Sequence, residues 1–241
     1  MFDDSGMAAD AKLELEGVTS GYGPVAIVKD LSLSIRRGEI FALMGKNGMG
    51  KTTLLKTILG LVAARGGEIR MDGASILGAS PKALVSAGLG YAPQEQPLFQ
   101  DLSIRDNLRL AVHSDKELAG ALERVFTHFP FLRDRLAQKA GTLSGGEQKM
   151  LIMARALMLG PDLLLIDEIS EGLQPTVIAR IAEALRAERE TNGTTILLVE
   201  QNLNFALDIA DRWAVLKLGE IDDSGETGPD SRARVLEHLK I

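Results

Sequence analysis

The stretch GKNGMGKTT, residues 45–53, fits the pattern G-x-x-x-x-G-K-[ST] and directly follows the apolar run IFALM at residues 40–44. Such a run is typical of a strand buried on both faces, and the spacing of apolar residues at 52–61 predicts a helix after the loop. Glycines let successive backbone N–H groups curl around a phosphate, and a helix that begins at the loop points its positive end at the anion. The sequence therefore predicts a phosphate-binding loop between a buried strand and a helix.

The loop also carries the side chains that a nucleoside triphosphate and its metal require. In this pattern Lys51 reaches the outer phosphates, and the hydroxyl of Thr52 is a ligand of Mg²⁺. The alternative is a glycine-rich turn that merely joins a strand to a helix. Because both flanking elements are indicated by the sequence, we favour the phosphate site. The residues of the loop expected to contact the nucleotide are Gly45, Asn47, Gly48, Gly50, Lys51, Thr52 and Thr53.

The acidic pair Asp167 and Glu168 ends a second apolar run, LLLI at residues 163–166, which predicts another buried strand. A buried carboxylate costs several kcal/mol unless a cation meets it. We expect this strand to lie beside the strand before the loop, so that Asp167 holds Mg²⁺ directly or through water. Glu168 would reach past the metal toward the γ-phosphate and polarise an attacking water. The alternative is a buried strand that simply ends in an acidic turn.

The composition excludes several classes of protein. The chain has 241 residues, 45% of them hydrophobic and 25% charged, which is ordinary for a globular protein. A net charge of −6 offers no bulk attraction to nucleic acid, and we expect no nucleic-acid partner. The lack of cysteine rules out disulfides and thiolate metal sites. We expect neither a signal peptide nor a membrane span, because the longest apolar stretch, residues 150–159, is shorter than the roughly 20 residues that cross a bilayer.

The remaining pattern indicates an α/β core with a helical insert. Alternation at residues 12–18 and 31–35 predicts half-buried strands, and EIRMDG followed by ASI predicts a hairpin that turns at Asp72 and Gly73. Helical spacing runs from residue 104 to 159. Strands are expected again at 162–167, 194–200 and 213–218, with helices at 175–189 and 230–241. Residues 1–11 are expected to form a flexible tail.

The segment LSGGEQ, residues 143–148, closes the helical region and opens an apolar helix. Ser-Gly-Gly alone is a common turn or helix cap, but here it stands twenty residues before the acidic strand. With this motif the chain resembles the ATP-binding cassette (ABC) ATPases, whose signature reads LSGGQ. The resemblance extends over residues 13–218 and includes six motifs in the family's order. It implies an α/β fold, in which a P-loop NTPase (RecA-like) core carries an antiparallel β subdomain and an inserted α-helical subdomain.

The resemblance assigns regions and roles to matching positions. Residues 12–241 would be one ABC ATPase domain, with the core and β subdomain at 12–95 and 160–220 and the helical subdomain at 96–159. Tyr22 would stack on adenine, Gln94 in YAPQE would belong to a glutamine loop, and residues 170–173 would form the D-loop. The cofactors would be ATP and Mg²⁺. The metal ligands would be Thr52, Gln94 and Asp167, and the catalytic residues would be Glu168, Gln201 and Lys51.

In this family two cassettes face head to tail, and each ATP lies between the P-loop of one chain and the signature of the other. Ser144, Gly145 and Gly146 would offer a hydroxyl and backbone N–H groups to the γ-phosphate at the start of a helix. One chain alone would not complete the site. Water would attack in line, with no covalent enzyme intermediate.

Two positions depart from the family's pattern. Lys46 stands where Pro or Arg is usual, at a variable position of the loop. The switch residue is usually His, but ILLVEQN places Gln201 there, and His113, His128 and His238 lie elsewhere. A glutamine donates a hydrogen bond but does not carry a proton. We therefore expect hydrolysis that is slower or more dependent on partners.

The segments ILLVEQN, SEGLQP and GYGPVAIVKDLSLSI resemble the branched-chain amino acid importer ATPases, above all the second ATPase subunit of Liv-type systems. Ile169 replaces the proline usual in DEPSEGL, and urea and short-chain amide importers share the pattern. The resemblance implies a subunit that binds and hydrolyses ATP to power uptake of a branched-chain amino acid, or a related amino acid, urea or amide, through a separate permease. Its partners would be permease subunits and a second ABC ATPase, identical or a sister chain, on the cytoplasmic face of the bacterial plasma membrane.

Two other classes of protein are alternatives to a transport ATPase. Among non-transport ABC ATPases of DNA repair, translation or cofactor assembly, repair proteins carry a long coiled coil and translation factors carry two cassettes, and neither feature is indicated here. A catalytically dead binding module would lack residues that are intact in this chain. These are Lys51, Thr52, Asp167, Glu168 and the signature.

The segment QEQPLFQD, residues 94–101, combines an apolar Pro-Leu-Phe patch with polar flanks. In the family this region faces the groove that receives a permease helix. We therefore expect Leu98→Asp or Phe99→Asp to leave basal ATPase activity intact while uncoupling it from the permease. The alternative is that this patch is a buried hinge contact.

Overall fold

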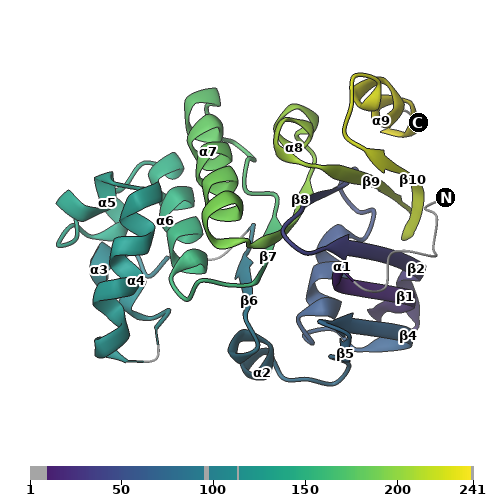
Figure 1. The fold of residues 1–241 in the computed structure, drawn as a ribbon, viewed down its shortest axis with the longest axis horizontal. Coiled ribbons are helices and arrows are strands. Elements are labelled where there is room, and N and C mark those ends of the chain that lie inside the picture. Colours follow the sequence, from purple (N-terminus) through teal and green to yellow (C-terminus); the bar gives the residue numbers. More distant parts are fainter. Residues whose placement is uncertain (1–9, 95–97, 113, 240–241) are drawn as a thin grey trace.

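Two β-sheets organise the part of the chain that the computed structural model describes, residues 10–94, 98–112 and 114–239 (Figure 1). The first sheet is antiparallel, in the order β2-β1-β4-β5. The second has the order β10-β9-β3-β8-β7-β6 and is parallel except where β10 pairs with β9. The strands are β1 (Ala11–Tyr22), β2 (Val25–Arg36), β3 (Ile40–Met44), β4 (Ala64–Met71), β5 (Ala74–Ser75), β6 (Leu89–Ala92), β7 (Leu163–Asp167), β8 (Thr195–Glu200), β9 (Arg212–Lys217) and β10 (Glu220–Glu226).

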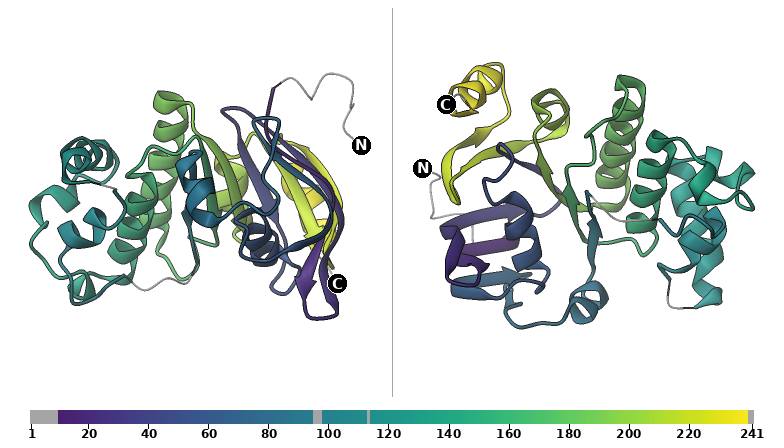
Figure 2. Two further views of the ribbon diagram at one scale, coloured as in Figure 1. Left: turned by 90° about the horizontal axis from the view of Figure 1, so that it is seen from below. Right: turned by 180° about the vertical axis from the view of Figure 1, so that it is seen from behind.

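The helices flank these sheets, and α3 to α6 gather at the end of the molecule opposite the antiparallel sheet (Figures 1 and 2). A short 3-10 turn at Ala140–Thr142 precedes α6. The α-helices are α1 (Lys51–Ile58), α2 (Pro81–Ser86), α3 (Ile104–Arg109), α4 (Asp115–His128), α5 (Phe131–Asp134), α6 (Gly145–Leu157), α7 (Pro175–Asn192), α8 (Leu203–Ile209) and α9 (Ser231–Leu239).

The central strands are buried because they are apolar on both faces, as their continuous runs predicted. Every residue of β3, β7 and β8 is buried. Ile40, Ala42 and Met44 of β3 enter the core that contains α4, α6 and α7. The alternate residues Phe41 and Leu43 enter the core formed with α1 and the antiparallel sheet. This two-sided packing confirms the predicted α/β core and places the carboxyl ends of β3, β7 and β8 at one edge.

The order of the parallel strands corrects one expectation, that the two motif-bearing strands are neighbours. β8 lies between β3 and β7 and pairs in parallel with both. Strand order is set by long-range pairing and leaves no mark on the local pattern of either strand. The motifs nevertheless meet, because α1 packs against β7. The hydroxyl of Thr52, on α1, therefore donates to Asp167 Oδ1, at the end of β7, over 3.4 Å.

At the edges of the sheets, one predicted turn is confirmed and two further expectations are corrected. Asp72 and Gly73 both have positive φ angles, 54° and 75°, as a two-residue hairpin turn favours, and β4 and β5 pair beside them. Ala11, expected in the tail, is buried in β1 and pairs with Arg36; residues 1–9 lie outside the described part. The sequence did not predict strand β10, EIDDSGE, because its acidic residues obscure the apolar pattern by which a strand is predicted. Such charges suit a strand at the edge of a sheet.

The helical insert lies between β6 and β7. Its last helix, α6, starts with a capping box, in which Ser144 Oγ accepts from Glu147 N at 3.3 Å and Glu147 Oε2 accepts from Ser144 N at 2.9 Å. The apolar side of the insert packs into the same core as β7 and α7. Within residues 10–94, 98–112 and 114–239, no helix combines the length and the apolar character needed to cross a membrane.

Candidate functional site

The phosphate loop joins β3 to α1 in a conformation that needs its glycines. Gly48 and Gly50 have φ angles of 81° and 107°, a region that side chains with a Cβ rarely adopt. A Cβ on Gly45 would stand 2.6 Å from the carbonyl oxygen of Leu216. The loop wraps around the ammonium of Lys51, whose Nζ donates to the carbonyl oxygens of Gly45 at 2.6 Å and of Lys46 at 2.8 Å.

The loop forms one wall of a pocket of about 250 Å³. Tyr22, at the end of β1, is 52% exposed beside it, so its ring is accessible to a planar ligand. Ile27, which was not singled out in the sequence, also lines the pocket. The predicted site residues that the pocket brings together are Tyr22, Asn47, Gly48, Gly50, Lys51, Thr52, Thr53, Gln94 and Glu168.

Asp167 ends β7, directly before Glu168, and is 1% exposed. Burial raises the pKa of Asp167 and the charge of Glu168 raises it further, against the hydrogen bond from Thr52 and the charge of Lys51. The Thr52 hydroxyl and the Asp167 carboxylate stand 3.4 Å apart. Mg²⁺ takes oxygen ligands and commonly binds through one or two protein groups together with substrate phosphates. The donor set present here therefore fits Mg²⁺.

Glu168 occupies the centre of the site and is the point at which the predicted catalytic residues meet. Lys51 Nζ lies 2.9 Å from Glu168 Oε1, and both side chains are almost fully buried. The side-chain amides of Gln94 and Gln201 donate to Glu168 Oε2 at 3.2 and 2.7 Å. Glu168 itself has a φ angle of 43°, an uncommon value for a residue other than glycine. The cation that compensates these buried acids in this structure is Lys51.

The two glutamines connect Glu168 to different parts of the molecule. Gln201, after β8, also donates to Asn47 Oδ1 at 2.5 Å and so reaches the phosphate loop. Gln94, after β6, also donates to Glu171 Oε2 at 2.6 Å. The backbone carbonyl of Gln94 accepts from Lys149 Nζ at 2.6 Å, which ties it to α6 of the helical insert.

The signature residues are not brought to this pocket by the fold. Ser144, Gly145 and Gly146 lie at the start of α6, where Ser144 Oγ is engaged with Glu147. Ser144 and Gly145 are exposed. A Cβ on Gly146 would stand 2.9 Å from Val177 of α7, so the glycine is needed for packing there.

One buried acid near the site was missed. Glu200 ends β8, is 1% exposed and accepts hydrogen bonds from Ser170, Gln201 and Asn202. Burial raises the pKa of Glu200, against these hydrogen bonds. The signal was present in the sequence, because ILLVE, like LLLID, is an apolar run that ends in an acid.

A groove of about 410 Å³ lies where the helical insert meets α2 and β6. Apolar side chains with exposed fractions of 37% to 56% line it, namely Val85, Phe99, Leu110 and Leu159. Leu98, by contrast, is 4% exposed and belongs to the core. The expected surface position is therefore wrong for Leu98, whose side chain fills the hinge region instead. Residues 95–97 of the same segment lie outside the described residues.

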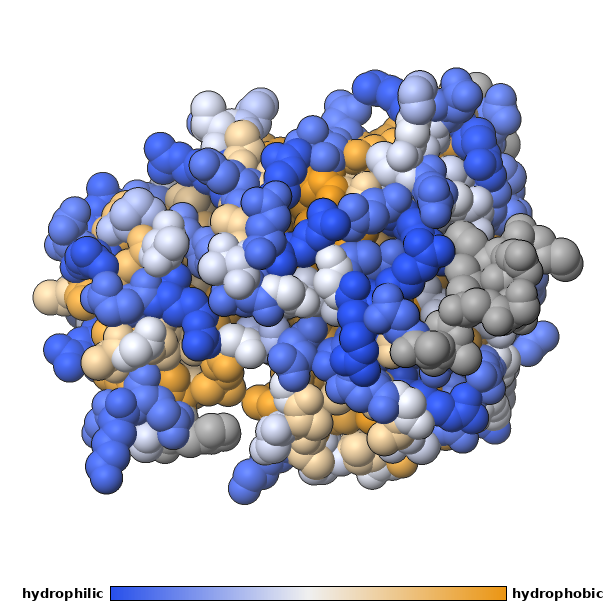
Figure 3. Space-filling view, in the orientation of Figure 1, coloured by the Kyte–Doolittle hydropathy of each residue, from blue (hydrophilic) through white to orange (hydrophobic). Residues whose placement is uncertain are grey.

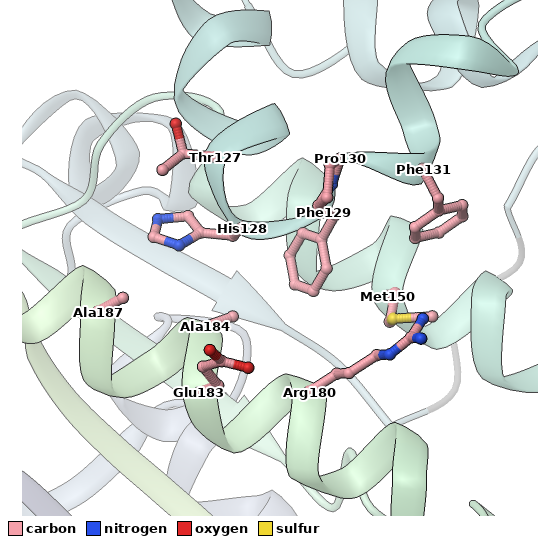
Figure 4. A pocket seen from close by; sticks show the side chains of 10 residues that line it. All are labelled: Thr127, His128, Phe129, Pro130, Phe131, Met150, Arg180, Glu183, Ala184 and Ala187. Carbon is pink, nitrogen blue, oxygen red and sulfur yellow. The ribbon is translucent and has the colours of Figure 1, made fainter.

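Another pocket, of about 490 Å³, opens between the end of α4 and α7 (Figure 4). His128, Phe129 and Phe131 face it from one side, and Arg180 and Glu183 from the other. None of the predicted site residues lines it. It is separate from the phosphate loop.

Comparison with known proteins gives one matching family model and three similar proteins. A family model described as ABC transporter matches residues 28–171. The chain is 40% identical over 211 residues to the high-affinity branched-chain amino acid transport ATP-binding protein BraG of Pseudomonas aeruginosa, with 87% of this chain and 90% of that protein covered. It is 36% identical over 226 residues to the probable branched-chain amino acid transport ATP-binding protein LivF of Archaeoglobus fulgidus, with 93% and 94% covered. A dimeric ATP-binding cassette in a post-hydrolysis state, bound to ADP and Pi, matches with a TM-score of 0.79 at 25% identity, covering 90% of this chain and 99% of that one.

Proposed function

The chain belongs to the ABC transporter family of ATPases, and from this membership we propose that it powers an importer of branched-chain amino acids. The observation that carries ATP hydrolysis in this proposal is the convergence of Lys51, Gln94 and Gln201 on the carboxylate of Glu168 beside the phosphate loop. Phosphoryl transfer to water depends on positioning and charge neutralisation more than on covalent chemistry. These four residues supply both.

Nucleotide binding rests on the loop and on Tyr22. The loop's backbone N–H groups and the start of α1 favour a polyphosphate, and the exposed ring of Tyr22 offers a face for adenine. Thr52 and Asp167 would hold Mg²⁺. When bound, Mg²⁺ neutralises charge on the phosphate oxygens.

In hydrolysis, Glu168 would accept a hydrogen bond from the attacking water and so orient it toward the γ-phosphate. Lys51 would donate to the phosphate oxygens. Gln201 would hold the carboxylate of Glu168 through its amide while keeping Asn47 of the loop in place. Because glutamine does not titrate, no proton passes through this contact.

A complete site would need a second cassette. Ser144, Gly145 and Gly146 stand at the N-terminal end of α6, outside the pocket of their own chain. A helix start with exposed N–H groups suits a phosphate, so these residues would close the pocket of a facing chain. The dimeric cassette bound to ADP and Pi supports such an arrangement.

The permease would dock in the groove beside α2. Figure 3 shows apolar side chains on both sides of the notch between α2 and the helical insert. Phe99 and Leu110 are each 56% exposed there, and an apolar helix that enters the groove would cover them. Such docking would hold the chain at the inner face of the plasma membrane.

The proposed solute follows the names of BraG and LivF, which match along nearly the whole chain. The test is uptake by proteoliposomes that contain this chain together with the permeases, second ATPase and binding protein of a branched-chain amino acid importer. We expect ATP-dependent accumulation of labelled leucine, isoleucine or valine. Accumulation of urea or acetamide in place of these three would reassign the solute. Hydrolysis without any uptake would point to a function outside transport.

A further inference from the structure

Glu200 is a buried carboxylate that the proposed reaction does not use. It ends β8 and is 1% exposed. Its Oε1 accepts from the backbone N–H of Ser170 at 3.0 Å, and its Oε2 accepts from the Ser170 hydroxyl at 2.8 Å. Oε2 also accepts from the backbone N–H groups of Gln201 at 3.2 Å and Asn202 at 3.4 Å. All four contacts are donations to the carboxylate, which only an ionised acid accepts without rearrangement.

These contacts join two segments that meet at the site. Ser170 follows Glu168 by two residues, and Gln201 follows Glu200 directly. The two segments meet again where the amide of Gln201 donates to Glu168 Oε2 at 2.7 Å. The backbone N–H of Glu168 in turn donates to the carbonyl of Val199 at 2.9 Å. Glu200 therefore closes a ring of contacts that contains both Glu168 and Gln201.

The backbone of Glu168 makes this ring necessary. Its φ angle of 43° costs free energy for a residue with a side chain, and such a conformation persists only where its neighbours hold it. Val199 holds the segment before Ile169, and Glu200 holds it after, at Ser170. Without the second anchor, the backbone of Glu168 is free to return to a negative φ angle and withdraw its carboxylate.

We propose that Glu200 is a positioning residue for ATP hydrolysis, which fixes Glu168 and Gln201 relative to each other through Ser170 and the start of the segment after β8. The inference rests on the proposed ATPase reaction and not on the identity of the solute. Among the residues that the structure describes, the hydrogen-bond partners of Glu200 are Ser170, Gln201 and Asn202, none of them in the phosphate loop, so we expect nucleotide affinity not to depend on it. Loss of the Glu200 carboxylate should therefore lower kcat.

The test compares Glu200→Gln with Glu39→Gln in the full-length protein. Glu39 is also buried, at 6% exposed, but pairs with Arg212 away from the site, so it reports the general effect of removing a buried charge. Glu200→Gln places an amide N–H₂ against the N–H of Ser170, since its other oxygen position already accepts three donors. We expect kcat to fall about ten- to a hundredfold. KM and the Kd for ATP should stay within about twofold of wild type, and Glu39→Gln should change none of the three.

Ser170→Ala gives a second, milder variant, because it removes the hydroxyl contact and keeps the backbone N–H. We expect a smaller loss of kcat in the same direction, which keeps the test decisive if Glu200→Gln does not fold. Adding Glu200→Gln to Gln201→Ala should lower kcat by less than the product of the two single effects, because both act through the same contact.

Unchanged kcat in Glu200→Gln or, if that variant does not fold, in Ser170→Ala would overturn the positioning role. So would a loss of kcat equal to that in Glu39→Gln at equal loss of Tm, or full additivity with Gln201→Ala. Hydrolysis with the expected kcat pattern but without uptake of any of the proposed solutes would overturn the importer proposal alone.

Discussion

Gln201 Nε2 lies 2.7 Å from Glu168 Oε2 and 2.5 Å from Asn47 Oδ1, so one amide spans from the acid of the site to its phosphate loop. The sequence led us to expect this amide beside the γ-phosphate. In this structure the amide contacts the acid and the loop, and its place beside a γ-phosphate stays a prediction. Its side chain is turned into the site and does not merely cap the end of β8.

Gln201→Ala should lower ATP hydrolysis roughly ten- to a thousandfold, the range for losing one hydrogen bond to a charged group in the transition state. Gln201→His should be tolerated, because imidazole donates from nearly the same place. The pH profile distinguishes them: the wild type should lack a limb near pH 6.5, and the His variant should gain one. A Gln201→Ala rate equal to wild type, in the assembled transporter at saturating ATP, would show that the amide is dispensable.

Glu168→Gln should keep ATP binding and lose turnover, so that a closed dimer with trapped ATP accumulates. The substitution also removes the negative charge that lies 2.9 Å from Lys51 Nζ, which leaves Lys51 more available to phosphate. The measurements are single-turnover hydrolysis and size-exclusion chromatography with ATP. Turnover within a few-fold of wild type would mean that another group orients the water.

Phe99→Asp and Leu98→Asp should behave differently although they are adjacent. Phe99 is 56% exposed in the groove, so its substitution should change stability by less than about 0.5 kcal/mol and leave basal hydrolysis intact while abolishing stimulation by the permease. Leu98 is 4% exposed, and an aspartate there should lower Tm strongly because it buries an unpaired charge. Melting curves and permease-stimulated ATPase rates check both. A Phe99→Asp variant that retains full stimulation would place the permease elsewhere.

Glu188 should stabilise the contact between α7 and the helical insert in a pH-dependent way. It is fully buried, and its Oε2 lies 2.9 Å from His128 Nε2. Burial raises its pKa, but the hydrogen bonds from His128, Asn192 and Thr194 outweigh burial and lower the pKa below the ordinary value. A lowered pKa means stability that is present above the unfolded pKa and lost as pH falls through the folded one.

Glu188→Gln should therefore cost roughly 3 kcal/mol at pH 7, and the difference from wild type should shrink as pH falls below about 4.5. Urea unfolding of both proteins at pH 7 and below pH 4.5 measures this difference in the free energy of unfolding. The matched control is Glu183→Gln, an exposed acid on the same helix (Figure 4), for which no change is expected. A constant difference between wild type and Glu188→Gln across the pH range would rule out the titration.

The parts of the site that the sequence predicted are those encoded by local pattern. The glycines around Lys51 predict a phosphate-binding loop, and the apolar run before Asp167 predicts a buried strand. The loop, the strands and the pocket could therefore be predicted from the sequence. The place of β8 between β3 and β7 was not, because pairing partners are chosen by the whole sheet. Leu98 was misplaced for a related reason, since an apolar residue in a short polar segment has no period that tells its inner face from its outer one.

The ammonium of Lys51 has three donors, and in this structure two point to the carbonyls of Gly45 and Lys46 and the third to Glu168. In the proposed reaction, an arriving phosphate oxygen would replace the Glu168 carboxylate as the third acceptor of Lys51. Glu168 would become available to water only after Lys51 has bound the nucleotide. The salt bridge between Lys51 and Glu168 would thus hold back hydrolysis until ATP is bound.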